Sequence, residues 1–304
     1  MGREPTDAER DSYGAFLAGG GSTRDVVSQL LESPECQLNF FRNPRFRQLV
    51  APEPLPDDVT RLYLWHIPKT AGTSLREMLK VHFPPLENCD GLSLSELFRL
   101  SPARLHSFRL ITGHFGPVLP PLLADAPLIT TTVVREPIAI VPSIYCQWRD
   151  HGMPGHLCTE LSRELSFDEW CRSTRVWSQW SDPQARALAL PRTAPAWPGP
   201  SQSPEGANPV ADTIGGAELR DLAVGCLDQI DVVGTTEDLA AVYRTCLDRL
   251  DVPANDVPVA HVNAGRGLDQ PMSEDTREWL LAHNTVDTEL VARVRARSTE
   301  LSLS

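Results

Sequence analysis

The chain has 304 residues, 41% hydrophobic and 22% charged, a composition typical of a globular protein with a substantial core. Its 28 basic and 40 acidic residues give a net charge of −12, which argues against nucleic-acid binding, because that role needs a surplus of Lys and Arg. No run of about 18 apolar residues occurs, so no membrane span is expected.

Residues 1–50 predict a small helical segment. SYGAFLAGG and STRDVVSQLLESPEC indicate short helices, and Ser22 is a suitable N-cap for the second. This segment resembles the end of a bacterial repeat of unknown function, through its GR-x-P start, its aromatic helix and its final S-P-E. The N-terminus has no apolar signal core and the seven cysteines lack metal-ligand spacing, so we expect a cytoplasmic protein with reduced thiols. Residues 51–60, rich in Pro and Asp, predict a linker.

Residues 61–304 predict a single α/β domain, because short apolar runs alternate with helical stretches. The expected strands are RLYLWHI, FRLITGHF, LITTTVVRE and IDVVG. The expected helices are TSLREMLKVHF, SFDEWCRS, LAAVYRTCLDRL, IAIVPSIYCQWR with pairing that starts near Pro142, and a C-terminal stretch of two short helices or one broken helix. Residues 190–216, dense in Pro, Gly and Ser, predict a mobile surface insertion.

The stretch HIPKTAGTSL, residues 66–75, joins the first expected strand to its helix. A Gly/Ser/Thr loop before a helix gathers backbone N–H groups, and the helix dipole adds partial positive charge, so the stretch predicts an anion site. Lys69 adds a full charge, but it precedes Gly72, whereas the lysine follows the glycine in nucleotide-triphosphate loops. No expected strand ends in Asp, which argues against magnesium-assisted phosphoryl transfer. A strand-to-helix turn without a ligand is the alternative.

HIPKTAGTSL closely resembles the 5′-phosphosulfate loop of sulfotransferases that use 3′-phosphoadenosine 5′-phosphosulfate. It is most similar to the carbohydrate branch with the heparan and chondroitin O-sulfotransferases. The resemblance implies that Lys69 contacts the phosphosulfate and helps to neutralise the leaving group. It also implies that the donor is held by the loop residues Thr70, Ala71, Gly72, Thr73 and Ser74.

The stretch VVREPIAIVPSIY predicts a second anion site. Arg135 ends a strand and Ser143 follows eight residues later on the next helix, and a guanidinium with a hydroxyl can grip a phosphate. The pattern resembles the family's 3′-phosphate motif. The alternative is that Arg135 pairs with a carboxylate. Many relatives carry another Arg where this chain has Ile140, and Arg149 is a candidate to compensate.

Two later segments extend the resemblance. DVVGTTEDL is similar to the family's late V-G-x-x-E turn, and VAHVNAGRGL is similar to the loop that covers the donor's adenosine and 3′-phosphate. That loop would bring Asn263 and Arg266 to the donor. The four segments stand in the family's order, and the resemblance implies a three-layer P-loop-type fold with a parallel sheet flanked by helices.

Sulfuryl transfer to an alcohol needs a general base. His114, in LITGHFGP, is our candidate, because it follows a strand and so lies at the edge of the sheet where ligands bind. G-H-F also resembles the histidine segment of the uronyl and galactosaminyl sulfotransferases. His66 is the rival candidate, but it ends the first strand directly under the loop and is expected to orient that loop instead. Glu77 and Glu87 are further alternative bases. The neighbouring acids Asp168 and Glu169 are expected to start a helix.

The resemblance implies a sulfotransferase that moves a sulfuryl group from 3′-phosphoadenosine 5′-phosphosulfate to a hydroxyl. The acidic composition and the lack of an expected membrane span favour a soluble bacterial enzyme over a Golgi-type one. The acceptor would belong to a glycan, a glycolipid or a small molecule, and no metal would be required. Two alternatives stay open: a small-molecule kinase that needs ATP and magnesium, and a non-catalytic nucleotide-binding protein on the same fold. The sequence does not identify the acceptor or the oligomeric state.

Overall fold

The computed structural model describes residues 6–20, 26, 54–90, 92, 94–189, 216–253 and 267–301. By its internal contacts the chain divides into two units, Met1–Glu53 and Pro54–Ser304. The first unit contains helix α1 (Asp7–Ala18), which includes most of the predicted SYGAFLAGG helix. The predicted helix at 22–36 and the predicted insertion at 190–216 lie almost entirely outside the described residues.

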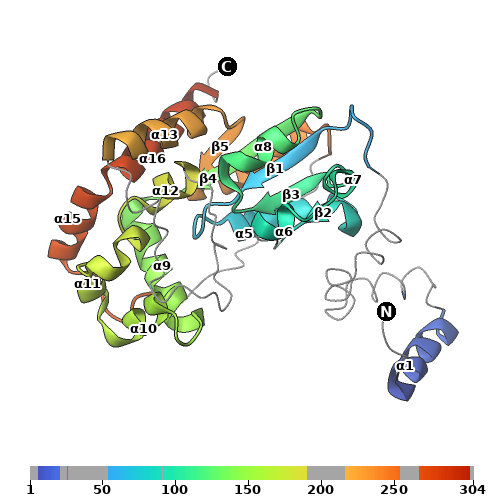
Figure 1. Ribbon diagram of the computed structural model, residues 1–304, viewed down its shortest axis with the longest axis horizontal. Coiled ribbons are helices and arrows are strands. Elements are labelled where there is room, and N and C mark those ends of the chain that lie inside the picture. Colours follow the sequence, from blue (N-terminus) through green and yellow to red (C-terminus); the bar gives the residue numbers. More distant parts are fainter. Residues whose placement is uncertain are drawn as a thin grey trace. The chain divides into compact units, whose positions relative to one another are not determined.

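The second unit is built on five parallel strands in the order β2-β3-β1-β4-β5 (Figure 1). Their bounds are β1 Arg61–Trp65, β2 Asn88–Cys89, β3 Leu110–Gly113, β4 Leu128–Val134 and β5 Val232–Thr235. The expected α/β fold with a parallel sheet is therefore confirmed. Strand β2 was not predicted, because two residues are too few to leave a pattern in the sequence.

Both faces of the sheet are covered by helices, which gives three layers. Tyr63 and Trp65 of β1 pack with α13 (Gly216–Asp228) and α16 (Thr285–Leu301). Leu62 and Leu64 pack on the opposite face with α5 (Gly72–Lys80) and α14 (Leu239–Arg249). Side chains alternate along a strand, so burial of both faces explains why β1 is apolar from Leu62 to Trp65.

Helix α9 (Pro137–His151) starts earlier than predicted. The backbone N–H groups of Ala139 and Ile140 already donate to the carbonyl oxygen of Glu136, so helical pairing does not wait for Pro142. Pro137 suits the first helical position, where an N–H has no partner within the helix. Pro142 removes only one further hydrogen bond, and the flanking turns keep the helix continuous.

Four helices form a third apolar core beside the sheet: α9, α10 (Leu157–Glu164), α11 (Phe167–Trp170) and α15 (Glu274–His283). They are grouped at one end of the unit in Figure 1. The C-terminal stretch forms two helices, α15 and α16, which confirms one of the two predicted forms. Glu169 completes a capping box with Ser166, so its predicted role at a helix start is also confirmed.

The remaining elements are short. They are η1 Pro85–Glu87, α6 Leu94–Leu97, α7 Pro102–Leu105, η2 Gly116–Val118, α8 Leu119–Leu122, η3 Thr174–Gln179, α12 Pro183–Ala189 and η4 Thr236–Asp238. Among the described helices, none combines the length and apolar character needed to cross a membrane. The described residues also contain no cluster of three or more potential metal ligands.

Two carboxylates are buried where α16 meets the start of α12. Asp287 is fully inaccessible to solvent, and its backbone N–H donates to Asp182 Oδ1 over 2.9 Å. Burial raises the pKa of Asp287 to about 7, and the nearby Asp182 contributes to the rise. Burial also raises the pKa of Asp182, although Arg186 and His283 face it and oppose that shift.

We expect Asp287 to make the protein less stable as the pH rises from about 4 to about 7. Between these pH values the carboxyl group of Asp287 is protonated in the folded state but ionised in the unfolded state. A rise in pH therefore favours the unfolded state, until the folded state ionises as well. The free energy of unfolding of the wild type minus that of Asp287→Asn should therefore fall through this window and then level off. Denaturant titrations at several pH values measure it; a difference that stays flat would contradict the burial argument.

Candidate active site

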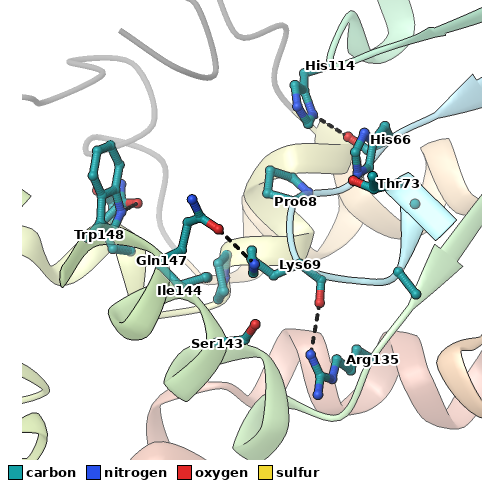
Figure 2. A pocket seen from close by; sticks show the side chains of 15 residues that line it. His66, Pro68, Lys69, Thr73, His114, Arg135, Ser143, Ile144, Gln147 and Trp148 are labelled. Atoms are coloured by element: carbon teal, nitrogen blue, oxygen red, sulfur yellow. Dashed lines mark hydrogen bonds between the residues drawn. The ribbon is translucent and has the colours of Figure 1, made fainter. Parts of the chain in front are cut away.

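A cavity of about 370 Å³ lies at the carboxyl ends of β1, β3 and β4. The order of the sheet reverses here, because β3 lies on one side of β1 and β4 lies on the other. Such a switch point opens a crevice beyond the strand ends. The cavity brings together the following predicted site residues: His66, Lys69, Ala71, Gly72, Thr73, His114, Arg135 and Ser143 (Figure 2).

The loop between β1 and α5 has an unusual backbone. Lys69 (φ +67°) and Ala71 (φ +64°) both adopt the left-handed conformation, whereas Thr70 between them does not. Alternation of this kind turns successive N–H groups toward one side and forms a concave anion site. Left-handed residues with side chains are uncommon and concentrate at functional sites. The loop geometry therefore favours a ligand over a plain connection.

The start of α5 adds to this anion site. Ala71 is the N-cap residue and makes no side-chain hydrogen bond to the first turn, so among the described residues this helix start has no side-chain cap of its own. Gly72 and Thr73, in the first turn, line the cavity. The N–H groups of a first helical turn carry partial positive charge and need an acceptor from outside the helix. A bound anion would supply that acceptor.

Two predicted loop residues do not line the cavity. Thr70 is 1% exposed, and its hydroxyl donates to the carbonyl oxygen of Ile67 over 2.9 Å. Ser74 is 6% exposed and faces the core side of α5. The side chain of Thr70 thus stabilises the loop from within, and neither Thr70 nor Ser74 is among the residues that line the cavity.

Gly72 is required by its close approach to His66. A Cβ atom at position 72 would lie 2.1 Å from Cδ2 of the His66 ring, far inside van der Waals contact. His66 directly follows β1, and its ring also stacks on that of His114 with 4.7 Å between centroids. The ring has little room to retreat. His66 therefore packs against the loop, which is the position expected of a residue that orients the loop.

We expect Gly72→Ala to destabilise the protein by about 1–3 kcal/mol, the usual range for overpacking, and to weaken anion binding at the loop. Chemical denaturation and calorimetric titration with a nucleotide bisphosphate measure the two effects. Gly225→Ala is the matched control, because a Cβ at this glycine of α13 meets nothing within 4 Å. An equally mild result for both variants would mean that the loop adapts to the methyl group.

The hydrogen bond of His114 assigns its tautomer. Its Nδ1 lies 2.5 Å from the carbonyl oxygen of His66, and a carbonyl oxygen can only accept. Nδ1 of the neutral ring therefore carries the proton, and Nε2 carries the lone pair. The pairing of Trp65 with Gly113 in β1 and β3 brings these two histidines side by side. His114 is thus oriented as a proton acceptor at the cavity, which is what a general base requires.

Two half-buried cations, Lys69 and Arg135, line the cavity. The pKa of Lys69 is lowered by burial and further by repulsion from Arg135. The pKa of Arg135 is also lowered by burial, and Glu237 partly opposes this. Among the described residues their side-chain partners are neutral: Lys69 Nζ donates to Gln147 Oε1 (3.1 Å) and Arg135 Nη1 donates to the carbonyl oxygen of Lys69 (3.2 Å).

This arrangement favours an anionic ligand. Buried charges that repel each other are unfavourable unless an opposite charge lies between them. Figure 2 shows Ser143 on α9 with its hydroxyl directed toward the space between Lys69 and Arg135. Among the described residues Arg135 forms no ion pair with a carboxylate: its side chain donates to the Lys69 carbonyl oxygen, and Glu237 acts on it only through its charge.

The sequence did not predict the residues that line the other side of the cavity, across from the loop. They include Gln147, Trp148, Ser178 and Gln179. The Trp148 ring lies parallel to His156 at 4.5 Å, and its Nε1 donates to Gln179 Oε1 over 3.3 Å. Gln147 stands one helical turn after Ser143, a spacing that could have revealed it. Ser178 and Gln179 belong to η3, where no sequence pattern pointed to the site.

The other candidates lie elsewhere or outside the description. Ile140 is fully buried in the core of α9–α11, so this position faces the helices rather than the cavity. Arg149 pairs with Asp150 and Asp269 and does not line the cavity, which removes it as a compensating cation. Neither alternative base, Glu77 nor Glu87, lines the cavity. Asn263 and Arg266 lie outside the described residues.

Comparison with known proteins gives no further guide to this site. No protein-family model matches the chain, and no curated protein shows significant similarity to it. The chemistry of the cavity follows from its own residues: a left-handed loop at a helix N-terminus, two half-buried cations, and a histidine oriented by a backbone carbonyl oxygen.

Proposed function

We propose that the protein is a sulfotransferase that moves a sulfuryl group from 3′-phosphoadenosine 5′-phosphosulfate to a hydroxyl group. One observation carries this proposal: a single cavity is lined by two cations, Lys69 and Arg135, and by a histidine, His114, whose Nδ1 is held by a backbone carbonyl oxygen. Lys69 with the loop and the start of α5 would make one anion site, and Arg135 with Ser143 would make the other. A nucleotide with anionic groups at both its 5′ and 3′ positions would fill both.

The transfer itself needs only groups already at the cavity. The acceptor oxygen attacks sulfur as the bond from sulfur to the 5′-phosphate oxygen breaks, and the hydroxyl proton passes to Nε2 of His114. The products are a sulfate ester and adenosine 3′,5′-bisphosphate. Negative charge grows on the departing phosphate, where Lys69 and the N–H groups of the loop would stabilise it. Preorganised donors of this kind act most strongly when partly buried, as Lys69 is.

The second anion site would hold the 3′-phosphate. A guanidinium offers several N–H donors in one plane and can bind two phosphate oxygens at once, while the Ser143 hydroxyl serves a third. Because one donor molecule would bridge both sites, each would help to hold the other end in position. Binding at both sites would also fix the position of the donor's sulfuryl group beside the acceptor hydroxyl.

The other residues that line the cavity suit a neutral acceptor that carries hydroxyl groups. The described residues that line the cavity include no acidic side chain, and Lys69 and Arg135 are the only Lys and Arg among them. Gln147, Gln179 and Ser178 instead offer amide and hydroxyl groups beside the Trp148 ring. Such groups suit an acceptor rich in hydroxyls, and a glycan, a glycolipid or a small-molecule alcohol would each qualify.

Ligand-dependent melting tests the nucleotide. Adenosine 3′,5′-bisphosphate without metal should raise the melting temperature, because a ligand that binds only the folded state stabilises it. ATP with magnesium should raise it less. Transfer of radiolabelled sulfate from the donor to a mixed pool of hydroxyl acceptors should then proceed in EDTA. Stabilisation by ATP–magnesium with EDTA-sensitive transfer would instead indicate a kinase, and bisphosphate binding without any transfer would indicate a non-catalytic binding protein.

A further inference from the structure

We propose that Gln184 is a positioning residue that sets the recognition of the 3′-phosphate through the backbone of Arg135. The inference rests on the proposed function, since it assigns the 3′-phosphate to Arg135. Gln184 opens α12 and is fully buried, and it is not among the residues that line the cavity. Its side chain forms hydrogen bonds with the backbone of Arg135, which lies 49 residues earlier in the chain.

Gln184 and Arg135 are joined by two hydrogen bonds, one to each polar group of the Arg135 backbone. The backbone N–H of Arg135 donates to Gln184 Oε1 over 2.8 Å, and Gln184 Nε2 donates to the carbonyl oxygen of Arg135 over 2.7 Å. The carboxamide thus pairs with Arg135 as the peptide group of a neighbouring strand would. Both distances are within the range of good hydrogen bonds.

Arg135 needs such a partner because the sheet ends just before it. The pairing of β4 with β5 runs only as far as Val134 opposite Thr235, and α9 begins at Pro137. Arg135 therefore lies in a two-residue connection with neither a strand nor a helix to hold its backbone. The direction of its side chain follows from that backbone, so the carboxamide of Gln184 helps to determine where the guanidinium points.

Gln184 is itself held by a buried network. Asp287 of α16 accepts hydrogen bonds from Gln184 Nε2 (3.2 Å), from the Gln184 backbone N–H (3.1 Å) and from the Ala185 backbone N–H (2.7 Å). Asp287 in turn donates its backbone N–H to Asp182, whose own N–H donates to Asn284. These contacts attach the carboxamide to the C-terminal helices.

The network also fixes which way the carboxamide faces. Nε2 lies against two acceptors, the Arg135 carbonyl and the Asp287 carboxylate, while Oε1 lies against an N–H donor. A flipped carboxamide would set its oxygen against both acceptors and its nitrogen against the donor, so only one orientation is satisfied. Buried polar groups satisfied in this way make rigid supports. A guanidinium on such a support is preorganised, which lowers the entropy lost when it binds a phosphate.

The test compares two nucleotides that differ only in the 3′-phosphate, adenosine 3′,5′-bisphosphate and adenosine 5′-monophosphate. Gln184→Met keeps the length of the side chain and removes both hydrogen bonds. We expect it to weaken bisphosphate binding at least about tenfold and monophosphate binding less than about twofold, by calorimetric titration. Gln184→Asn, which keeps the amide but is one methylene shorter, should show the same selective loss. Gln229→Met, at an exposed glutamine, is the control.

A double-mutant cycle sharpens the result. Arg135→Ala should remove most of the preference for the bisphosphate, and adding Gln184→Met to it should change that preference no further. Equal losses for both nucleotides in Gln184→Met would mean a general effect on folding, and would overturn the proposal. An undiminished preference would overturn it as well.

A measurement without nucleotide separates this inference from the proposed function. In the ligand-free protein, Gln184→Met should speed amide hydrogen exchange at Arg135 more than at the neighbouring β4 residues, because only the Arg135 N–H loses its acceptor. If the wild type bound neither nucleotide while this exchange rose, the donor assignment would fail and the positioning role would stand. Unchanged exchange would overturn the positioning role whatever the nucleotides do.

Discussion

Replacing His114 by alanine is expected to reduce sulfuryl transfer by roughly 10²–10⁴-fold, the usual contribution of a general base. Affinity for adenosine 3′,5′-bisphosphate should stay nearly unchanged. The reason is the tautomer: with Nδ1 donating to the His66 carbonyl oxygen, a neutral ring has its lone pair on Nε2, which in the proposed reaction would take the acceptor's proton. The cations that would hold the nucleotide, Lys69 and Arg135, belong to other elements. Steady-state kinetics and calorimetric titration of the same preparations measure the two quantities.

A second variant separates proton transfer from loop positioning. His114→Asn has an amide group that can still donate to the His66 carbonyl oxygen, but it has no basic nitrogen. If His114 acts as the base, the Asn variant should be as slow as the Ala variant. Recovery of turnover in His114→Asn would show that the hydrogen bond to the loop matters and that proton transfer does not. Unchanged turnover in His114→Ala would exclude the histidine from the chemistry.

The second large effect is expected for Lys69→Ala, with kcat/KM for sulfuryl transfer lowered by about 10- to 150-fold. This range corresponds to the roughly 1.5–3 kcal/mol of a hydrogen bond to a charged group. Because charge grows on the leaving phosphate during transfer, kcat should fall more than bisphosphate affinity does. Initial rates over a range of donor concentrations, together with the dissociation constant of the bisphosphate, resolve the two parameters.

Two comparisons make the Lys69 result specific. Lys69 is left-handed at φ +67°, a conformation that glycine adopts without strain. Lys69→Gly should therefore lose activity as Lys69→Ala does while keeping a more stable loop. Lys80→Ala, at the end of helix α5, removes a lysine that pairs with Asp90 away from the cavity and should leave kinetics unchanged. Similar losses in Lys69→Ala and Lys80→Ala would point to net charge rather than to the site.

Most of the sheet could be predicted because its signals are local. Strands β1, β3, β4 and β5 are apolar or β-branched runs, and each stands out from its immediate neighbours. The anion loop could also be predicted, since a strand, a Gly/Ser/Thr turn and a helix follow one another without interruption between Arg61 and Lys80. Strand β2 was not predicted because two residues leave no pattern, and α9 was expected to start later because a proline such as Pro142 usually interrupts the turns before it.

The assembly of the site was only partly predictable. Each of the residues His114, Lys69 and Arg135 follows a strand, so their common edge could be inferred from a parallel sheet. The wall with Gln147, Trp148 and Gln179 could not, because η3 reaches the cavity only through its packing on α9. Asn263 and Arg266, predicted from a resemblance alone, stay predictions because they lie outside the described residues.

The sequence by itself determined where the chain carries its chemistry: a lysine and a helix start after the first strand, a histidine after another strand, and an arginine with a serine one strand further on. The tertiary structure decided how these groups work together. It placed β1 between β3 and β4, turned Nδ1 of His114 to the His66 carbonyl, and brought Gln184 to the backbone of Arg135. The physical reason is distance along the chain. Propensity and periodicity act between neighbours, whereas hydrogen bonds across 48 or 49 residues form only once the strand order and the packing of α12 and α16 have brought their partners together.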